Sequence, residues 1–144
     1  MMTVLAGALC LVLVGIAALH AYWGLSGRWP ARDEPGLADM VIGKTPGGRM
    51  PPPAACFAVA AAILIGVGLI ALVSFTDLQD PSKLPIQLAY GVFAAVFVLR
   101  GAAGYVPAIW RRSAGTAFAR LNTRYYSPLC LLLGAGLIIN LAGR

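Results

Sequence analysis

The sequence predicts an all-α fold, an integral membrane four-helix bundle, and three observations point to it. Hydrophobic residues make up 60% of the 144 residues and charged residues only 11%, whereas about a quarter of an ordinary soluble domain is charged. Four long stretches are almost free of charge, and no repeat or polar segment marks a separate soluble domain. We therefore expect residues 1–144 to form one membrane domain whose apolar surface faces lipid.

The first apolar stretch covers residues 2–24. A helix of that length rises about 34 Å, which is enough to cross a hydrocarbon core of about 30 Å. A secretory signal peptide is a poor interpretation, because the stretch has no charged start and ends in His20, Tyr22 and Trp23, where a cleavage site would need small residues. We therefore expect this span to remain in the mature protein.

Three further stretches continue the pattern, at residues 54–76, 84–106 and 128–143. The last is the shortest. The pair Ser127 and Pro128 is typical of an N-cap followed by proline at the first helical position, which predicts that the fourth span begins there. The free backbone N–H groups of such a start could receive an anion.

The three connections differ in composition. Residues 25–53 contain six prolines and several glycines, which predicts a long irregular loop. Residues 77–83 are short enough for a tight turn. Within residues 107–127, the segment 113–124 places apolar and basic side chains on opposite sides at helical spacing, as helices that lie on a membrane surface do.

The positive charge is distributed unequally between the two sides. Eight Lys and Arg residues lie in the connections 25–53 and 107–127, whereas the opposite side carries only Lys83 and Arg144. The positive-inside rule therefore predicts that both long loops are cytoplasmic and that both termini lie on the outer side of a bacterial inner membrane. Topology and anionic lipid head groups explain the net charge of +6, so no nucleic-acid partner is expected.

Arg100 is the residue with the highest expected free-energy cost of membrane insertion, because it is a charged side chain inside the third span. A charge within a span usually faces the bundle interior or a water-filled cavity, although an arginine so near the end of a span can also extend its side chain to the interface. No acidic residue lies within a span. The partners open to Arg100 are a carbonyl, a tyrosine, an anionic lipid, or one of the acids Asp33, Glu34 and Asp39 of the first loop.

Other polar and aromatic groups are expected at the same depth as Arg100. His20 ends the first span with Trp23 three residues on, and Asn122 precedes the fourth span. The candidate ligand-binding residues are therefore His20, Tyr22, Trp23, Arg100, Asn122, Tyr125 and Tyr126. The alternatives are a histidine that is hydrogen-bonded to a neighbouring helix and aromatic rings that anchor the bundle at the head groups.

No motif in the sequence assigns a reaction. One histidine without nearby acids or cysteines makes a poor metal site, and the three cysteines show no ligand spacing, so they are interpreted as small apolar packing residues. Phosphate-binding and nucleophile motifs are absent. We therefore predict no catalytic residue and no metal, and the sequence leaves open both the cofactor and whether the protein is an enzyme.

Three runs of residues resemble one family. They are His20-x-Tyr22-Trp23 at the end of the first span, Leu99-Arg100-Gly101-x-x-Gly104 in the third, and Tyr126-Ser127-Pro128-Leu129-Cys130 at the start of the fourth. They are similar to signatures of small bacterial four-span membrane proteins known as a domain of unknown function. The resemblance covers nearly the whole chain, and it implies a fold and a location without an activity.

Two functions of different classes follow. In the first, the candidate residues line a polar site in the inner leaflet that binds an amphiphile with an anionic or carbonyl head group, such as a phospholipid, an isoprenoid or a quinone. In the second, the chain is an accessory or structural subunit, whose Ala- and Gly-rich faces pack on a larger membrane complex. The partners considered are therefore the lipid bilayer, a bound lipid or quinone, and a larger membrane complex or a homo-oligomer. A transporter is a weaker third interpretation, because four spans are few.

Overall fold

The computed structural model describes residues 2–74 and 81–143, and this part of the chain is helical without any strand. Four helices are long and apolar enough to cross a membrane, which confirms the all-α prediction of four spans. They are α1 (Met2–Gly24), α3 (Pro53–Ser74), α4 (Leu84–Ala103) and a helix over Ala117–Ala142, whose last part is α6 (Ser127–Ala142). The shorter elements are α2 (Glu34–Val41), α5 (Ala117–Leu121), the π-helical η4 (Asn122–Tyr126), and the 3-10 turns η1 (Pro46–Gly48), η2 (Pro81–Lys83) and η3 (Arg111–Ser113).

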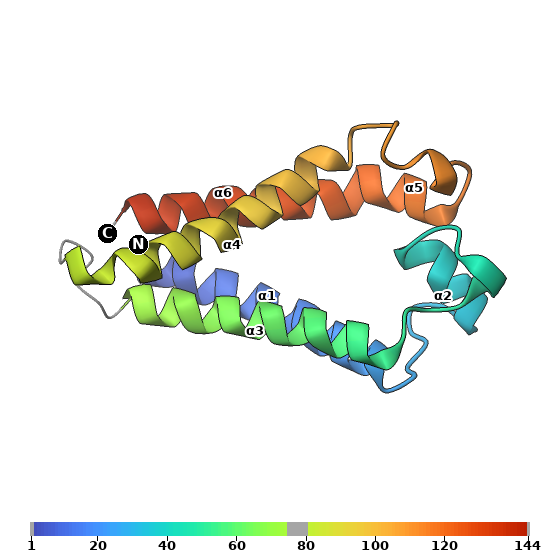
Figure 1. The fold of residues 1–144 in the computed structure, drawn as a ribbon, viewed down its shortest axis with the longest axis horizontal. Coiled ribbons are helices and arrows are strands. Elements are labelled where there is room, and N and C mark those ends of the chain that lie inside the picture. The colour runs from blue at the N-terminus through green and yellow to red at the C-terminus, as the bar shows by residue number, and fades with distance from the viewer. Residues whose placement is uncertain (1, 75–80, 144) are drawn as a thin grey trace.

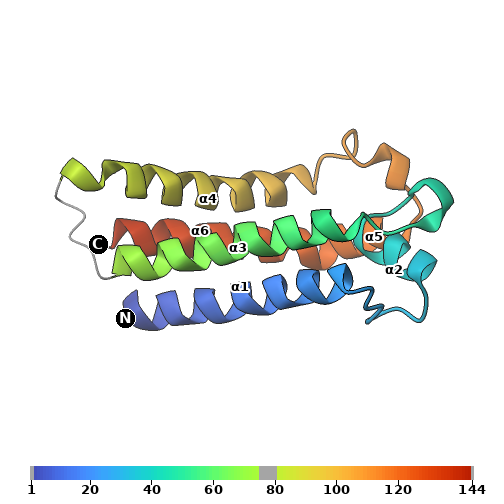
Figure 2. The same ribbon diagram turned by 60° about the horizontal axis from the view of Figure 1, so that its bottom comes forward.

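The long helices form two pairs. Helix α1 packs along α3, and α4 packs along α6, while α1 with α6 and α3 with α4 make the smaller contacts between the pairs. Both termini lie at one end of the bundle, which we call the terminus end, and α2 and α5 lie at the other, the loop end (Figures 1 and 2). The two long connections therefore share one end, as the sequence predicts.

The core runs between the helices and is made of aliphatic side chains. Leu13, Ile70, Val73 and Leu137 have no exposed surface and come from three different helices. Close helix approach depends on glycine, because a Cβ at Gly66 would collide with the ring of Phe93 on the neighbouring helix. The outward faces of the helices carry large exposed apolar residues, as lipid-facing surfaces do.

The first three spans match their predicted bounds closely. Helix α1 has the predicted bounds, and α3 begins one residue before residue 54 and is described as far as Ser74, because residues 75–80 lie outside the described part. Helix α4 begins at Leu84 as predicted but ends at Ala103, three residues early. After Ala103 the chain continues as a run of turns. Gly104 lies in close contact with the last helix at this point.

The last span begins earlier than the sequence predicts. Its N-cap is Thr116, whose side-chain oxygen accepts a hydrogen bond from the backbone N–H of Ala119 at 3.2 Å. From Ala117 the helix continues to Ala142 without a break, through α5, η4 and α6. The predicted start at residue 128 with Ser127 as N-cap was therefore wrong, and so was the anion-binding helix end expected there.

The pair Ser127 and Pro128 lies instead inside the helix, next to the wide turn η4. The N–H of Ser127 bonds to the carbonyl of Asn122, five residues back, which is the π-helical pattern. A proline inside an α-helix removes one backbone hydrogen bond and clashes with the preceding turn. We attribute the wide turn directly before Pro128 to this clash.

The first long connection is more ordered than its prolines suggest. Residues 34–41 form α2, capped by Asp33, whose Oδ1 accepts from the N–H of Gly36 at 2.8 Å. Its Leu37 is buried. The prediction of an irregular loop was wrong here, because Asp33 and Pro35 at the start of a helix favour it rather than break it.

The segment 113–124 is not a separate helix on a membrane surface. Its first residues form the turn at Ser113, and residues from Ala117 onward belong to the last span. Phe118, an apolar residue of this segment, is buried and packs in the protein. Its ring lies 5.2 Å from Trp110 and 6.2 Å from Tyr126 between ring centroids, so protein rather than lipid covers it.

Candidate functional site

Arg100 lies in the last turn of α4 and is held by two side chains. Its Nη2 donates to Oδ1 of Asn122 at 2.8 Å. The guanidinium carbon lies 5.0 Å from the ring centroid of Trp110, within range of a cation–π interaction. These two contacts favour a paired arginine over one that extends freely to the interface.

Asn122 ties Arg100 to the helix junction. Its side chain is buried, and its Nδ2 donates to the carbonyl of Gly104 at 3.3 Å. Its Oδ1 also accepts from the hydroxyl of Ser127 at 3.4 Å. A Cβ at Gly104 would collide with that hydroxyl, so the cluster forms because α4 and the last helix approach closely at a glycine. A Cβ at Gly101 would likewise collide with Leu131 of the last helix, as small residues at membrane helix contacts permit close approach.

One nitrogen of this cluster has no hydrogen-bond partner. Among the described residues, Nη1 of Arg100 is the buried side-chain donor or acceptor that has no hydrogen-bond partner. A guanidinium carries five donors, and leaving a buried one unpaired costs about 1–3 kcal/mol, or more for a charged group. The hydrogen bonding of Arg100 is therefore satisfied on the side of Asn122 and unsatisfied at the buried Nη1.

The acids of the first loop are engaged elsewhere. Asp33 caps α2, and Oε1 of Glu34 accepts from the N–H of Met50 at 3.0 Å. Oδ2 of Asp39 accepts from the N–H of Ala117 at 3.0 Å, at the start of the last span. Each carboxylate thus serves a backbone N–H, and Arg100 is hydrogen-bonded to an amide side chain instead.

Tyr126 and Tyr125, two of the predicted site residues, have different environments. The Tyr126 hydroxyl donates to the carbonyl of Met40 at 3.2 Å, which fastens α2 to the last helix. Ser113 donates to the carbonyl of Ile42 at 3.4 Å in the same contact. Tyr125 is exposed, with the guanidinium of Arg124 at 5.5 Å from its ring centroid.

The predicted residues of the first span form a separate group. Nδ1 of His20 donates to the carbonyl of Ile16 at 2.8 Å, one turn back, and its ring lies edge-on to Trp23 at 5.1 Å. Trp23 donates through Nε1 to the carbonyl of Trp29 at 2.9 Å. The structure thus brings Arg100 and Asn122 together, whereas the hydrogen bonds of His20 and Trp23 stay within α1 and the segment after it.

A second polar pair, which the sequence reasoning missed, lies at the terminus end. The hydroxyl of Tyr90 donates to Oδ1 of Asn140 at 3.0 Å, and Nδ2 of Asn140 donates to the carbonyl of Met2 at 3.5 Å. Both side chains are fully buried. The signal available was an uncharged amide inside an apolar span, which is costly unless it is hydrogen-bonded.

The described residues offer no metal centre. Residues 2–74 and 81–143 contain no group of three or more His, Cys, Asp and Glu side chains that could hold a metal ion. Cys10, Cys56 and Cys130 have free thiols. The cluster of Arg100 and Asn122 supports binding of an anionic group, because a guanidinium recognises carboxylate and phosphate oxygens.

Comparison with known proteins finds a family but no function. The family model described as "Protein of unknown function (DUF3995)" matches residues 13–137. No curated protein and no solved structure matches the chain. The matched segment contains the Arg100 and Asn122 cluster.

Proposed function

The chain belongs to the DUF3995 family, whose function is unknown, and on that premise we propose that it binds the head group of an amphiphile at Arg100. The amphiphile belongs to the class of phospholipids, isoprenoids and quinones, which carry an anionic or carbonyl head group. The proposed site lies at the loop end, which we assign to the cytoplasmic side of a bacterial inner membrane. Residues 1–144 act as one membrane domain in this proposal.

The unpaired Nη1 of Arg100 is the observation that carries the proposal. Asn122 occupies Nη2 and Trp110 covers the guanidinium, so the side chain is fixed and Nη1 has a defined direction. A charge-assisted hydrogen bond from such a nitrogen to a phosphate or carboxylate oxygen is about twice as strong as a neutral one. A head-group oxygen would therefore satisfy the donor that the protein leaves unpaired.

The position of Arg100 selects the kind of ligand. It lies in a helix that is long and apolar enough to cross a membrane, within one turn of its loop end. A ligand whose polar head reaches that depth has its apolar part in the hydrocarbon region. This supports an amphiphile over a water-soluble anion.

The experiment compares Arg100→Gln with Arg124→Ala. Protein reconstituted in vesicles of phosphatidylethanolamine and phosphatidylglycerol with added ubiquinone is extracted, and bound molecules are counted by native mass spectrometry. Gln keeps a donor for Asn122 but loses the charge and Nη1. Loss of a hydrogen bond to a charged group costs about 1.5–3 kcal/mol, so the share of protein that keeps a molecule at Arg100 is expected to fall about ten- to a hundredfold.

Arg124 supplies the matched control, because it also lies over an aromatic ring but is exposed. Arg124→Ala is expected to retain the ligand as the parent does. Equal retention in Arg100→Gln and Arg124→Ala contradicts the proposal. The chemical identity of the retained molecule distinguishes phospholipid from quinone.

The second candidate function is an accessory subunit, and one surface favours it. Ala58, Ala61 and Ala62 on α3 are exposed in this chain, and Ile65 beside them is 67% exposed. Small residues on such a face permit close packing of another helix. Size analysis after gentle solubilisation tests this: a complex larger than a homodimer supports it, and a lone monomer or a homodimer contradicts it.

A further inference from the structure

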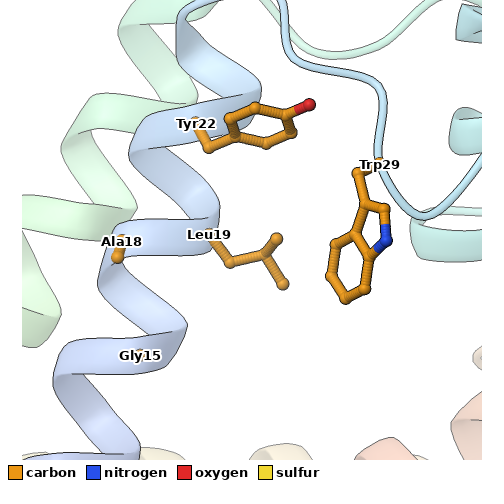
Figure 3. Close-up of a pocket in the computed structure, with 5 residues that line it drawn as sticks. All are labelled: Gly15, Ala18, Leu19, Tyr22 and Trp29. Atoms are coloured by element: carbon orange, nitrogen blue, oxygen red, sulfur yellow. The ribbon is translucent and has the colours of Figure 1, made fainter.

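A hollow of about 570 Å³ lies against the loop-end half of α1. It shares no lining residue with the Arg100 cluster and is lined by Gly15, Ala18, Leu19, Tyr22 and Trp29. Figure 3 shows Leu19 and Tyr22 projecting from α1 toward the indole of Trp29, which stands off from the helix on the segment that follows α1. The hollow is thus the space between a helix face and an aromatic wall.

The aromatic wall is fixed by contacts behind it. Trp23 donates through Nε1 to the carbonyl of Trp29 at 2.9 Å, and the N–H of Gly27 bonds to the carbonyl of Tyr22 at 2.9 Å. A Cβ at Gly27 would collide with the Tyr22 ring. The protein therefore holds the backbone of Trp29 beside α1, while the residue remains 65% exposed. The chain segment that carries the aromatic wall is thus fixed relative to the helix.

The lining changes from apolar to amphipathic along the helix axis. Gly15 is nine residues before the end of α1, so it lies about 14 Å from that end, at hydrocarbon depth. Tyr22 is near the end of the helix, where tyrosine and tryptophan rings meet the head-group region. In Figure 3 the Tyr22 ring extends away from α1, and its hydroxyl lies on the side of the helix where Trp29 stands. The hollow is therefore apolar at depth and carries a hydroxyl donor near the interface.

We propose that this hollow binds one phospholipid, with an acyl chain against Gly15 and Ala18 and its ester region beside the Tyr22 hydroxyl. The order of groups along α1 matches that of a phospholipid, whose ester carbonyls accept hydrogen bonds at the depth where its chains begin. A water-soluble ligand finds only the Tyr22 hydroxyl and the Trp29 indole N–H in an otherwise apolar lining.

The test fills the hollow without disturbing the fold. Gly15 and Gly7 both lie on α1, both are exposed, and a Cβ at either would meet no atom within 4 Å. Gly15 lines the hollow and Gly7 does not. Gly15→Leu is therefore expected to occupy the chain position, and Gly7→Leu is the matched control.

Native mass spectrometry from nanodiscs of phosphatidylethanolamine and phosphatidylglycerol gives the first readout. The parent and Gly7→Leu are expected to retain one more phospholipid than Gly15→Leu at the same collision energy. Equal retention in the two leucine variants overturns the proposal, whether both keep the lipid or both lose it. Since this site does not depend on Arg100, the Arg100→Gln variant is expected to keep this lipid.

Tryptophan quenching gives the second readout in an intact bilayer. Phospholipids with bromines on the acyl chain quench an indole that they contact, and the share that belongs to Trp29 is the difference between the parent and Trp29→Phe. That share is expected to fall at least twofold in Gly15→Leu and to remain in Gly7→Leu. An unchanged share in Gly15→Leu contradicts a chain bound between α1 and Trp29.

Discussion

Two polar pairs join α4 to the last helix, one at each end of the bundle, and they differ in what they leave unsatisfied. At the terminus end Tyr90 and Asn140 are uncharged and fully buried, and both polar atoms of the Asn140 amide are hydrogen-bonded. At the loop end the charged Arg100 donates a hydrogen bond to Asn122. The other terminal nitrogen of its guanidinium, Nη1, is buried without a hydrogen-bond partner.

The comparison separates a structural contact from a candidate site. Buried polar groups in native proteins are hydrogen-bonded, and an exception calls for an explanation such as an absent ion or ligand. Tyr90 and Asn140 follow the rule and need only the fold to explain them. Arg100 breaks the rule at one atom, and that atom is the part of the molecule where we expect a ligand.

The largest stability effect is expected where the loop-end pair is assembled. Gly104→Ala places a Cβ against the Ser127 hydroxyl, and this Cβ would lie 3.1 Å from Nδ2 of Asn122. Overpacking of this kind costs about 1–3 kcal/mol, and retention of the head group at Arg100 should fall with it. Titration with a denaturing detergent measures the free energy of unfolding.

Gly91 on the same helix supplies the control for Gly104. A Cβ at Gly91 would meet no atom within 4 Å, and alanine is favoured over glycine in a helix by about 1 kcal/mol. Gly91→Ala should therefore leave stability unchanged or raise it. If both alanine variants shift stability in the same direction, close approach at Gly104 is not what builds the site.

A smaller loss of stability is expected at the terminus end, without any change in binding. Asn140→Leu removes the acceptor of Tyr90 and the donor to Met2. Hydrogen bonds between membrane helices contribute about 0.6 kcal/mol on average and about 1.7 at most. The melting temperature in detergent should fall modestly while phospholipid retention at Arg100 stays at the parental value. A loss of retention would show that the two pairs are not independent.

The smallest effect is expected where α2 meets the start of the last span. The Asp39 carboxylate accepts from the N–H of Ala117, and a negative charge at a helix start contributes about 0.3–1 kcal/mol. Asp39→Asn keeps an acceptor and removes the charge, so unfolding in detergent should require slightly less denaturant at low salt. The difference should shrink as salt is added. A salt-independent loss would indicate packing rather than charge.

The fold was largely predictable because four apolar stretches determine it. Long uncharged stretches give the spans with little ambiguity, and the first span has its predicted bounds. The errors fall where local signals compete. Ser127 and Pro128 have the composition of a helix start, yet they lie within a helix whose π turn accommodates the proline. The prolines of the first loop suggested no helix, although Pro35 is in the first turn of α2.

The candidate site was predictable only in part, because its geometry depends on contacts distant in the sequence. The cost of a charge in a span drew attention to Arg100, but its pairing with Asn122 spans 22 residues. That pairing requires the close approach at Gly104, which sequence spacing does not supply. His20 drew attention as the sole histidine, but its Nδ1 is bonded within its own helix. Asn140 was missed because a neutral amide is a weaker sequence signal than a charge.

The most direct test of a head group bound at Arg100 is an experimental structure in a lipid nanodisc, at a resolution that shows side chains. We predict a head-group phosphate or carbonyl oxygen about 2.7–2.9 Å from Nη1 of Arg100, the usual length of a charge-assisted hydrogen bond. Asn122 should remain on Nη2. An Nη1 that is hydrogen-bonded to a protein acceptor, or that has no head group beside it, would contradict head-group binding at Arg100.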